Sequence, residues 1–115
     1  MTTRIYHNPK CSTSRKVLEA LREAGEEPEI IEYLKTPPTK SELKDLLKRM
    51  KMRPRDLLRK KEPLYKELKL DDEKKTDEQI IDAMLAHPIL IERPIVVTKK
   101  GVRLSRPPKI VNEIL

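Results

Sequence analysis

The sequence predicts an α/β domain with a helical insertion, and three observations lead to that prediction. Short runs rich in Ile, Val and Tyr lie towards both ends of the chain, at 3–7, 28–34 and 95–104. Apolar residues recur at helical spacing in the segments between and after these runs. Proline, glycine and capping-box patterns mark where the segments begin and end. A chain of 115 residues has room for one modest core, so we expect a single domain over 1–115.

The N-terminal third predicts a parallel βαβ unit. Thr3–His7 forms a first strand, an Asn-Pro turn signal follows it, and Pro28–Leu34 forms a second strand. Between them we expect a helix that is capped by Ser12 or Thr13 and stopped at Gly25. This order within about 30 residues is typical of a right-handed parallel crossover. The apolar face of the helix consists of Val17, Leu18, Leu21 and Ala24.

The middle of the chain predicts helices. Capping-box patterns at Thr39–Glu42 and Thr76–Gln79 each begin one, and the second ends at His87 before a proline. A short helix is expected at Pro54–Leu58, whereas Pro63–Leu70 fits either a short helix or a turn. The two main helices have apolar faces made of Leu43, Leu46, Leu47 and Met50, and of Ile80, Ile81, Met84 and Leu85.

The C-terminal part predicts a β-hairpin and a closing helix. Strands are expected at Ile95–Thr98 and Val102–Leu104 with a turn at Lys99–Gly101, and the helix at Pro107–Leu115 opens on prolines. Without the helical stretch, the order of elements is that of a thioredoxin-like fold. Residues of about 39–90 are therefore expected to be a helical insertion between the βαβ unit and the hairpin.

Composition limits the classes of partner. Charged residues make up 39% of the chain and the formal net charge is +7, which suits an anionic partner. Acidic and basic residues are mixed along most of the chain, which favours a solvated surface. The only aromatic residues are three tyrosines, so no stacking platform for single strands is visible. We expect no nucleic acid as a partner, whereas a small anion at one focused site remains open.

The chain has one cysteine, Cys11. An intramolecular disulfide and a Cys-rich zinc site are therefore excluded, and we expect no metal. The N-terminus shows no apolar leader, and no segment approaches the roughly 20 apolar residues of a membrane span. We expect a cytoplasmic monomer, in which the thiol stays reduced.

Cys11 follows a strand and a turn and directly precedes a predicted helix. The first N–H groups of a helix lack internal partners, and the helix dipole is positive there, so a thiolate is stabilised and an anion can bind. A thiol of pKa about 8.5 is roughly 3% ionised at pH 7, whereas one of about 6.5 is roughly 75% ionised. The polar surroundings favour this reading over a small buried hydrophobe.

Other polar residues are candidates for the same site. His7 ends the first strand, where it either favours the thiolate by charge or hydrogen bond or faces solvent. Arg93 and Arg106 each precede a proline and flank the hairpin, positions from which a guanidinium can bind an oxyanion. Arg59, near the end of a short helical segment, is unremarkable by itself. His87 is explained by its place at a helix end.

The sequence closely resembles the glutaredoxin-coupled arsenate reductases, essentially from end to end. The shared text includes YHNPKCSTSR at 6–15, EYLKTPPT at 32–39, LLRK at 57–60, TDEQIIDAML at 76–85, HPILIERPIVVT at 87–98, and the RPP that follows Ser105. The resemblance implies a thioredoxin-like fold with a helical insertion. It also implies that the proline before the third strand, Pro94, follows a cis peptide bond.

The family's site residues carry over one by one. The catalytic cysteine matches Cys11, and the histidine that tunes it matches His7. Asn8 and Ser14 fall at positions that line the same loop. The three arginines that bind the oxyanion match Arg59, Arg93 and Arg106.

The implied activity is reduction of arsenate to arsenite by attack of the Cys11 thiolate, with glutathione as co-substrate, glutaredoxin as protein partner and no bound cofactor. With one cysteine in the chain, the reductant must come from outside. Two alternatives remain open. One is a glutathione-dependent thiol/disulfide reductase, although all three arginines are retained. The other is a non-enzymatic regulator that binds RNA polymerase, although Ser14 stands where a CxxC switch needs its second cysteine.

Overall fold

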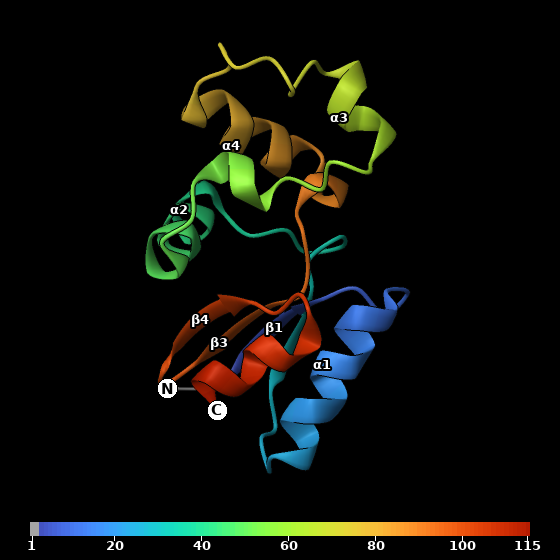
Figure 1. Cartoon of the computed structure of the whole chain (residues 1–115), viewed down its shortest axis with the longest axis vertical. Helices are drawn as coiled ribbons and strands as arrows, with labels where there is room; N and C mark the ends of the chain where they lie inside the picture. The colour runs from blue at the N-terminus through green and yellow to red at the C-terminus, as the bar shows by residue number, and fades with distance from the viewer. Residues whose placement is uncertain (1–2) are drawn as a thin grey trace. The chain divides into compact units, whose positions relative to one another are not determined.

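The computed structural model describes residues 3–115, which form two compact units (Figure 1). The first unit contains the described chain up to Thr36 together with Arg93–Leu115, and the second is Pro37–Glu92. The second unit thus spans the stretch that the sequence marks as a helical insertion. Each unit is built around its own elements.

The first unit contains a four-stranded sheet of order β2-β1-β3-β4. β1 and β2 are parallel, as the predicted crossover requires, whereas β1–β3 and β3–β4 are antiparallel. The expected hairpin is formed by β3 and β4, with Thr98 opposite Gly101. The bounds are β1 Arg4–His7, α1 Ser12–Glu23, β2 Glu29–Glu32, β3 Ile95–Thr98, β4 Gly101–Leu104 and the 3₁₀ helix η3 Pro108–Ile114.

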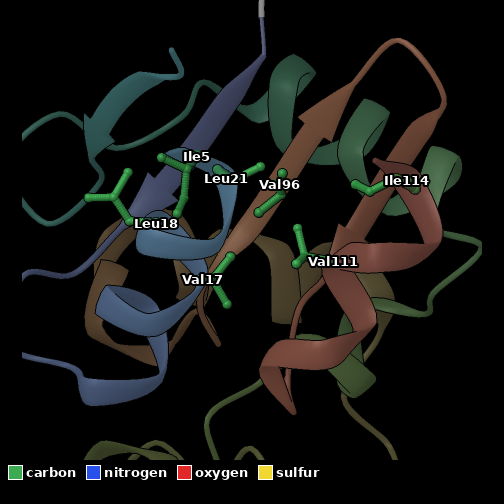
Figure 2. Close-up of a cluster of buried hydrophobic side chains, with 7 residues drawn as sticks. All are labelled: Ile5, Val17, Leu18, Leu21, Val96, Val111 and Ile114. Carbon is green, nitrogen blue, oxygen red and sulfur yellow. The ribbon is translucent and has the colours of Figure 1, made fainter. Parts of the chain in front are cut away.

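The core of this unit lies between the sheet and two helices, α1 and η3, which contact each other (Figure 2). Ile5 of β1 and Val96 of β3 are opposite one another in the sheet register, and both are fully buried. Replacing one of these aliphatic side chains by alanine typically costs 2–5 kcal/mol because a cavity is left behind. The cluster consists of Ile5, Val17, Leu18, Leu21, Val96, Val111 and Ile114.

α1 begins one residue earlier than the sequence suggests. The expected caps Ser12 and Thr13 are wrong: Cys11 is the N-cap, with φ −94° and ψ 122°. The cause is the Asn-Pro turn, because the Cys11 N–H donates to the Asn8 carbonyl at 3.0 Å and the Cys11 carbonyl accepts from the Arg15 N–H at 3.0 Å. The turn and the helix therefore join at the cysteine.

The end of α1 follows the expected glycine signal. Gly25 has φ +84°, a conformation open to glycine, and the N–H of the next residue donates to the Leu21 carbonyl at 2.9 Å. Ala24, expected on the apolar face, is instead the exposed C-cap. The expected C-terminal helix is 3₁₀, a winding that aligns side chains three residues apart, and it buries both Val111 and Ile114.

The second unit contains three helices and two short 3₁₀ turns. α4 contacts α2, η1 and η2, and Leu58 and Ile91 form an isolated antiparallel bridge between the segments that follow η1 and η2. Pro63–Leu70, left open by the sequence, forms a short helix and then a turn. The bounds are α2 Lys40–Met50, η1 Pro54–Leu57, α3 Pro63–Glu67, α4 Asp77–Ala86 and η2 Pro88–Leu90.

Both capping boxes are present. The Thr39 hydroxyl accepts from the Glu42 N–H at 3.1 Å, and the Thr76 hydroxyl accepts from the Gln79 N–H at 3.2 Å. In return, Glu42 and Gln79 accept from the N–H groups of the two threonines. The local sequence signal thus fixed both helix starts correctly.

Removing either cap is expected to destabilise the protein. Thr39→Ala and Thr76→Ala should each lower the free energy of unfolding by about 1 kcal/mol, measured by urea denaturation. Ser12→Ala is the matched control, because Ser12 is an exposed residue at the start of α1 but not its cap. A loss at Ser12 equal to that at the two threonines would contradict this account of the helix starts.

Candidate active site around Cys11

The loop that carries Cys11 is fixed by its own backbone and by Asn8. The Asn8 side chain is buried, and its Oδ1 accepts from the Lys10 N–H at 2.9 Å. On the other side of the loop, the Arg15 guanidinium donates to the Pro9 carbonyl at 2.9 Å. These contacts hold a partly exposed thiol at the first turn of α1.

Two arginines from the other end of the chain lie at the sulfur. Arg106 Nη1 is 3.7 Å from Cys11 Sγ, and the same nitrogen donates to the Arg93 carbonyl at 3.0 Å. The Arg93 side chain is itself buried and acts on the thiolate. The sequence prediction that Arg93 and Arg106 flank the hairpin beside Cys11 therefore agrees with this geometry.

The two arginines occupy equivalent places in the chain. Each is followed by a proline, and both the Arg93–Pro94 and Arg106–Pro107 peptide bonds are cis. The first bond confirms the expectation for Pro94. The second was missed, although the repeated Arg-Pro pair on the two sides of the hairpin is the signal that pointed to it. The Ser105 N–H joins the two loops by donating to the Pro94 carbonyl at 2.9 Å.

The surroundings lower the pKa of the Cys11 thiol to about 7. Partial burial alone would raise this pKa, but the helix start and the arginines outweigh it. The Ser14 backbone N–H makes the largest lowering contribution, and Arg93 and Arg106 follow. Although the Cys11 side chain forms no capping hydrogen bond at the start of α1, the Ser14 N–H is placed to donate to the thiolate and so favours ionisation.

The His7 side chain is hydrogen-bonded to Ser14, in the first turn of α1 after Cys11. Its Nδ1 is 2.6 Å from Ser14 Oγ, which also accepts from the Asn8 N–H at 3.1 Å. Burial lowers the pKa of His7 and so favours the neutral ring, although Glu32 opposes this. The tautomer of His7 decides which of the two groups donates, because a hydroxyl and a neutral imidazole nitrogen can each take either role. The solvent-facing alternative for His7 is wrong, because the residue is buried.

Arg59 belongs to the second unit, and its side-chain partner lies in the same unit. Its Nη1 donates to Glu92 Oε1 at 2.9 Å, and both side chains are about four-fifths buried. Its backbone N–H donates to the Leu90 carbonyl at 2.7 Å. The pairing with Glu92 was not visible in the sequence, because the two residues are far apart in the chain and have no shared motif.

The geometry around Cys11 suits a small oxyanion. An ionisable thiol, the start of a helix and two guanidinium groups provide a nucleophile and several donors for negative charge. Among residues 3–115, no group of three or more His, Cys, Asp or Glu side chains is placed to hold a metal ion. No helix within this range has the length and hydropathy to cross a membrane.

Comparison with known proteins agrees with the motifs. The model of the ArsC family matches residues 6–114, nearly the whole chain. The chain belongs to the ArsC family. An ArsC structure described as an arsenate reductase from Vibrio cholerae superposes with a TM-score of 0.95 at 48% identity, covering 100% of this chain and 98% of that one. The fold class, thioredoxin-like with a helical insertion, is thereby confirmed.

Sequence relatives in the ArsC family include longer proteins and proteins of similar length. The arsenate reductase of Escherichia coli (strain K12) is 57% identical over 111 residues, which are 96% of this chain and 79% of that protein. A second protein of the same strain, described as uncharacterized, is 50% identical over 113 residues, which are 97% of this chain and 95% of that one.

Alkylation of Cys11 tests the ionised thiol. The rate with iodoacetamide should rise through a midpoint near pH 7 and then level off, because only the thiolate reacts. Arg106→Ala should move the midpoint upwards. The lowered pKa also affects stability. Because the pKa of Cys11 is lower in the folded state than in the unfolded state, the free energy of unfolding should increase as pH rises from about 7 towards 9. A midpoint at or above about 8.5 would refute the activated thiolate.

The contact between His7 and Ser14 gives a second prediction. His7→Ala and Ser14→Ala should each raise the alkylation midpoint, because both loosen the helix start whose N–H groups act on the sulfur. The double variant should shift it no further than the larger single change, since both residues act through one contact. Thr13→Ala, in the same turn but with no such bond, is the control. Additive shifts would show that His7 acts on Cys11 independently of Ser14.

Proposed function

We propose that this protein reduces arsenate to arsenite with Cys11 as the nucleophile. The observation that carries the proposal is the thiol of pKa about 7 at a helix start, with Arg106 Nη1 at 3.7 Å, in a chain of the ArsC family. Near neutral pH about half of such a thiol is ionised, so the nucleophilic thiolate is available. The relatives described as arsenate reductases support the choice of substrate.

Substrate binding follows from charge. Arsenate is a phosphate-like anion, and Arg93 and Arg106 lie where they can neutralise it beside the sulfur. The Arg106 fork already donates to the Arg93 carbonyl through Nη1, which fixes its orientation before substrate arrives. Such donors stabilise charge as it develops on the oxygens of the transition state.

The chemistry needs two thiols. The Cys11 thiolate attacks arsenic, an As–S bond forms, and one oxygen leaves as water after protonation. Glutathione then supplies the second sulfur. The two sulfurs become a mixed disulfide, and arsenic takes their two electrons and departs as arsenite. Because the sequence has one cysteine, no internal thiol can resolve that disulfide, and glutaredoxin is the proposed partner that does so.

Arg59 is proposed as the third oxyanion ligand on the basis of the resemblance. Glu92 binds Nη1 and leaves the other nitrogens of the guanidinium for a ligand. The pair with Glu92 also fixes the direction of the fork. We further propose that the protein acts in the cytoplasm as a monomer, without bound cofactor, metal or nucleic acid, in resistance to arsenical compounds.

A coupled assay tests the activity. Arsenate, glutathione, glutaredoxin, glutathione reductase and NADPH are combined with the protein, and oxidation of NADPH is followed together with arsenite release. Turnover that requires both arsenate and Cys11 is expected, and Cys11→Ser is the control. Arsenate-independent turnover of a mixed disulfide with no arsenite would instead favour a thiol/disulfide reductase.

The three arginines give the sharpest test of substrate. Arg59→Ala, Arg93→Ala and Arg106→Ala should each lose a charge-assisted hydrogen bond of roughly 1.5–3 kcal/mol, or about 10- to 150-fold in kcat/KM for arsenate. Arg→Lys should recover only part, because the planar fork is lost. The exposed or half-exposed Arg22→Ala and Arg49→Ala should cost almost nothing.

The same variants are then assayed on a neutral disulfide. If the arginines bind arsenate, reaction of Cys11 with 2-hydroxyethyl disulfide survives while arsenate reduction falls. A parallel fall in both activities would assign the arginines to the thiolate or to the fold. Unchanged arsenate reduction in all three variants would overturn the site.

A further inference from the structure

The net charge of the chain is concentrated in fourteen residues, 48–61. This stretch, which we call the basic segment, carries eight Lys or Arg residues and a single acidic residue, Asp56. The residues before it contain eight basic and eight acidic side chains, and those after it contain ten of each. The formal charge of +7 therefore belongs to the basic segment alone.

The fold turns these charges outwards. In the second unit the segment runs from the last turn of α2 through η1 to the turn after the Leu58 bridge, the bright green part of the chain (Figure 1). Its apolar residues Pro54, Leu57 and Leu58 are buried. Five of its cations are exposed, and these are Lys48, Lys51, Arg53, Lys60 and Lys61.

The exposed cations are not neutralised within the unit. Lys40 and Lys44, in the first half of α2, form ion pairs with Glu78 of α4. In contrast, the ion pairs formed within residues 3–115 include none of the five exposed cations of the basic segment. The negative end of α2 explains cations at Lys48 and Lys51, but it does not reach Arg53 or the pair after Leu58.

Two further cations of the segment have internal roles. Arg55 donates to the carbonyls of Leu70, Asp72 and Lys75, and Arg59 is held by Glu92. The segment is therefore a braced structure that presents unpaired charge, and not a floppy basic tail. Such a surface attracts an acidic partner over roughly the Debye length of 8 Å at physiological salt.

We propose that the basic segment is the docking surface for an acidic thiol-donor protein, one that reduces Cys11 after it has become disulfide-bonded. The inference rests on the proposed function, in which an external protein must supply the final thiol. Transient redox encounters bury little surface and depend on complementary charge for their rate. A strip of unpaired cations matches that requirement.

The same charges fit nucleic acid less well. The basic segment contains no aromatic residue on which a base could stack. Asp56 is exposed in the middle of the strip, where a uniformly anionic phosphate backbone would be repelled. A folded protein surface can place a lysine opposite Asp56 and carboxylates opposite its neighbours. The pattern of charge, and not only its sign, favours an acidic protein.

The test isolates one chemical step. Cys11 is first converted to its mixed disulfide with oxidised glutathione, which releases one glutathione thiolate. A thiolate of an acidic glutaredoxin then attacks the glutathione sulfur: the Cys11 thiol is released, and the glutathione moves to glutaredoxin. Mass spectrometry gives the second-order rate constant for this transfer of glutathione. The rate constant is measured at ionic strengths from 20 to 500 mM, over which the Debye length falls from about 20 to 4 Å.

Two quadruple variants carry the same net charge. One is K51Q/R53Q/K60Q/K61Q, and the control is K16Q/K66Q/K74Q/K99Q, four exposed lysines outside the segment. The first variant should lower the low-salt rate constant about ten-fold and flatten its salt dependence, whereas the control should resemble the parent protein. Unchanged melting temperature and unchanged iodoacetamide reactivity of Cys11 verify that both variants are folded.

Three results would overturn the proposal. Equal losses in the two variants would mean that net charge matters and the segment does not. No loss in either would mean that docking lies elsewhere. The third result concerns a fluorescent 20-base-pair DNA duplex at 150 mM salt. If the parent protein and the control bind it, the first variant does not, and the thiol-transfer rate of the first variant is unchanged, the segment binds nucleic acid instead. Because the assay contains no arsenate, its outcome is separable from that of arsenate reduction.

Discussion

The site depends on the way in which α1 begins. A helix N-cap is usually an Asn, Asp, Ser or Thr whose oxygen accepts from an N–H in the first turn. Here the N-cap is Cys11, whose side chain makes no such bond, although Ser12 and Thr13 stand next in the chain. A threonine or serine cap would typically add about 1 kcal/mol of stability. The cysteine leaves the first N–H groups available to a thiolate and to an anion, which is where the reactivity of the sulfur originates.

Most of the fold was accessible from the sequence because its signals are local. Both capping boxes, the glycine at the end of α1 and the hairpin turn use residues within a few positions of one another. One error, the N-cap of α1, came from the local turn before Cys11, and another arose where distant parts of the chain decide the structure. The 3₁₀ winding of η3 depends on burying Val111 and Ile114 against the sheet and α1, and the Thr98 hydroxyl fixes its end by donating to the Ile114 carbonyl at 2.6 Å. Periodicity alone cannot show such contacts.

In the candidate site, too, some features follow from the sequence and others do not. The position of Cys11 at a helix start follows from the neighbouring sequence, and the placement of Arg93 and Arg106 follows from the order of the strands. The hydrogen-bond partners of these residues do not follow from the sequence: Arg106 donates to the Arg93 carbonyl, and His7 is hydrogen-bonded to Ser14. Burial lowers the pKa of His7 and disfavours its charged form, and the role of His7 in tuning the thiolate stays a prediction. Arg59 is noticeable only through family resemblance, since its partner Glu92 is distant in sequence.

Positive charges in this chain act over two different distances. At Cys11, two guanidinium groups and the first N–H groups of α1 act over a few ångströms, where partial burial limits screening by salt. In the basic segment, exposed cations act in water, where each contributes little to stability and salt screens them strongly. Short-range charge therefore lowers the pKa of the thiol, and the same groups are the proposed oxyanion ligands. Exposed charge can change the rate of encounter without altering the chemistry. Because the rest of the chain is balanced in charge, the whole excess lies in the basic segment. Charge gathered in this way attracts an anionic partner to one surface, whereas the same excess spread evenly would give no preferred surface.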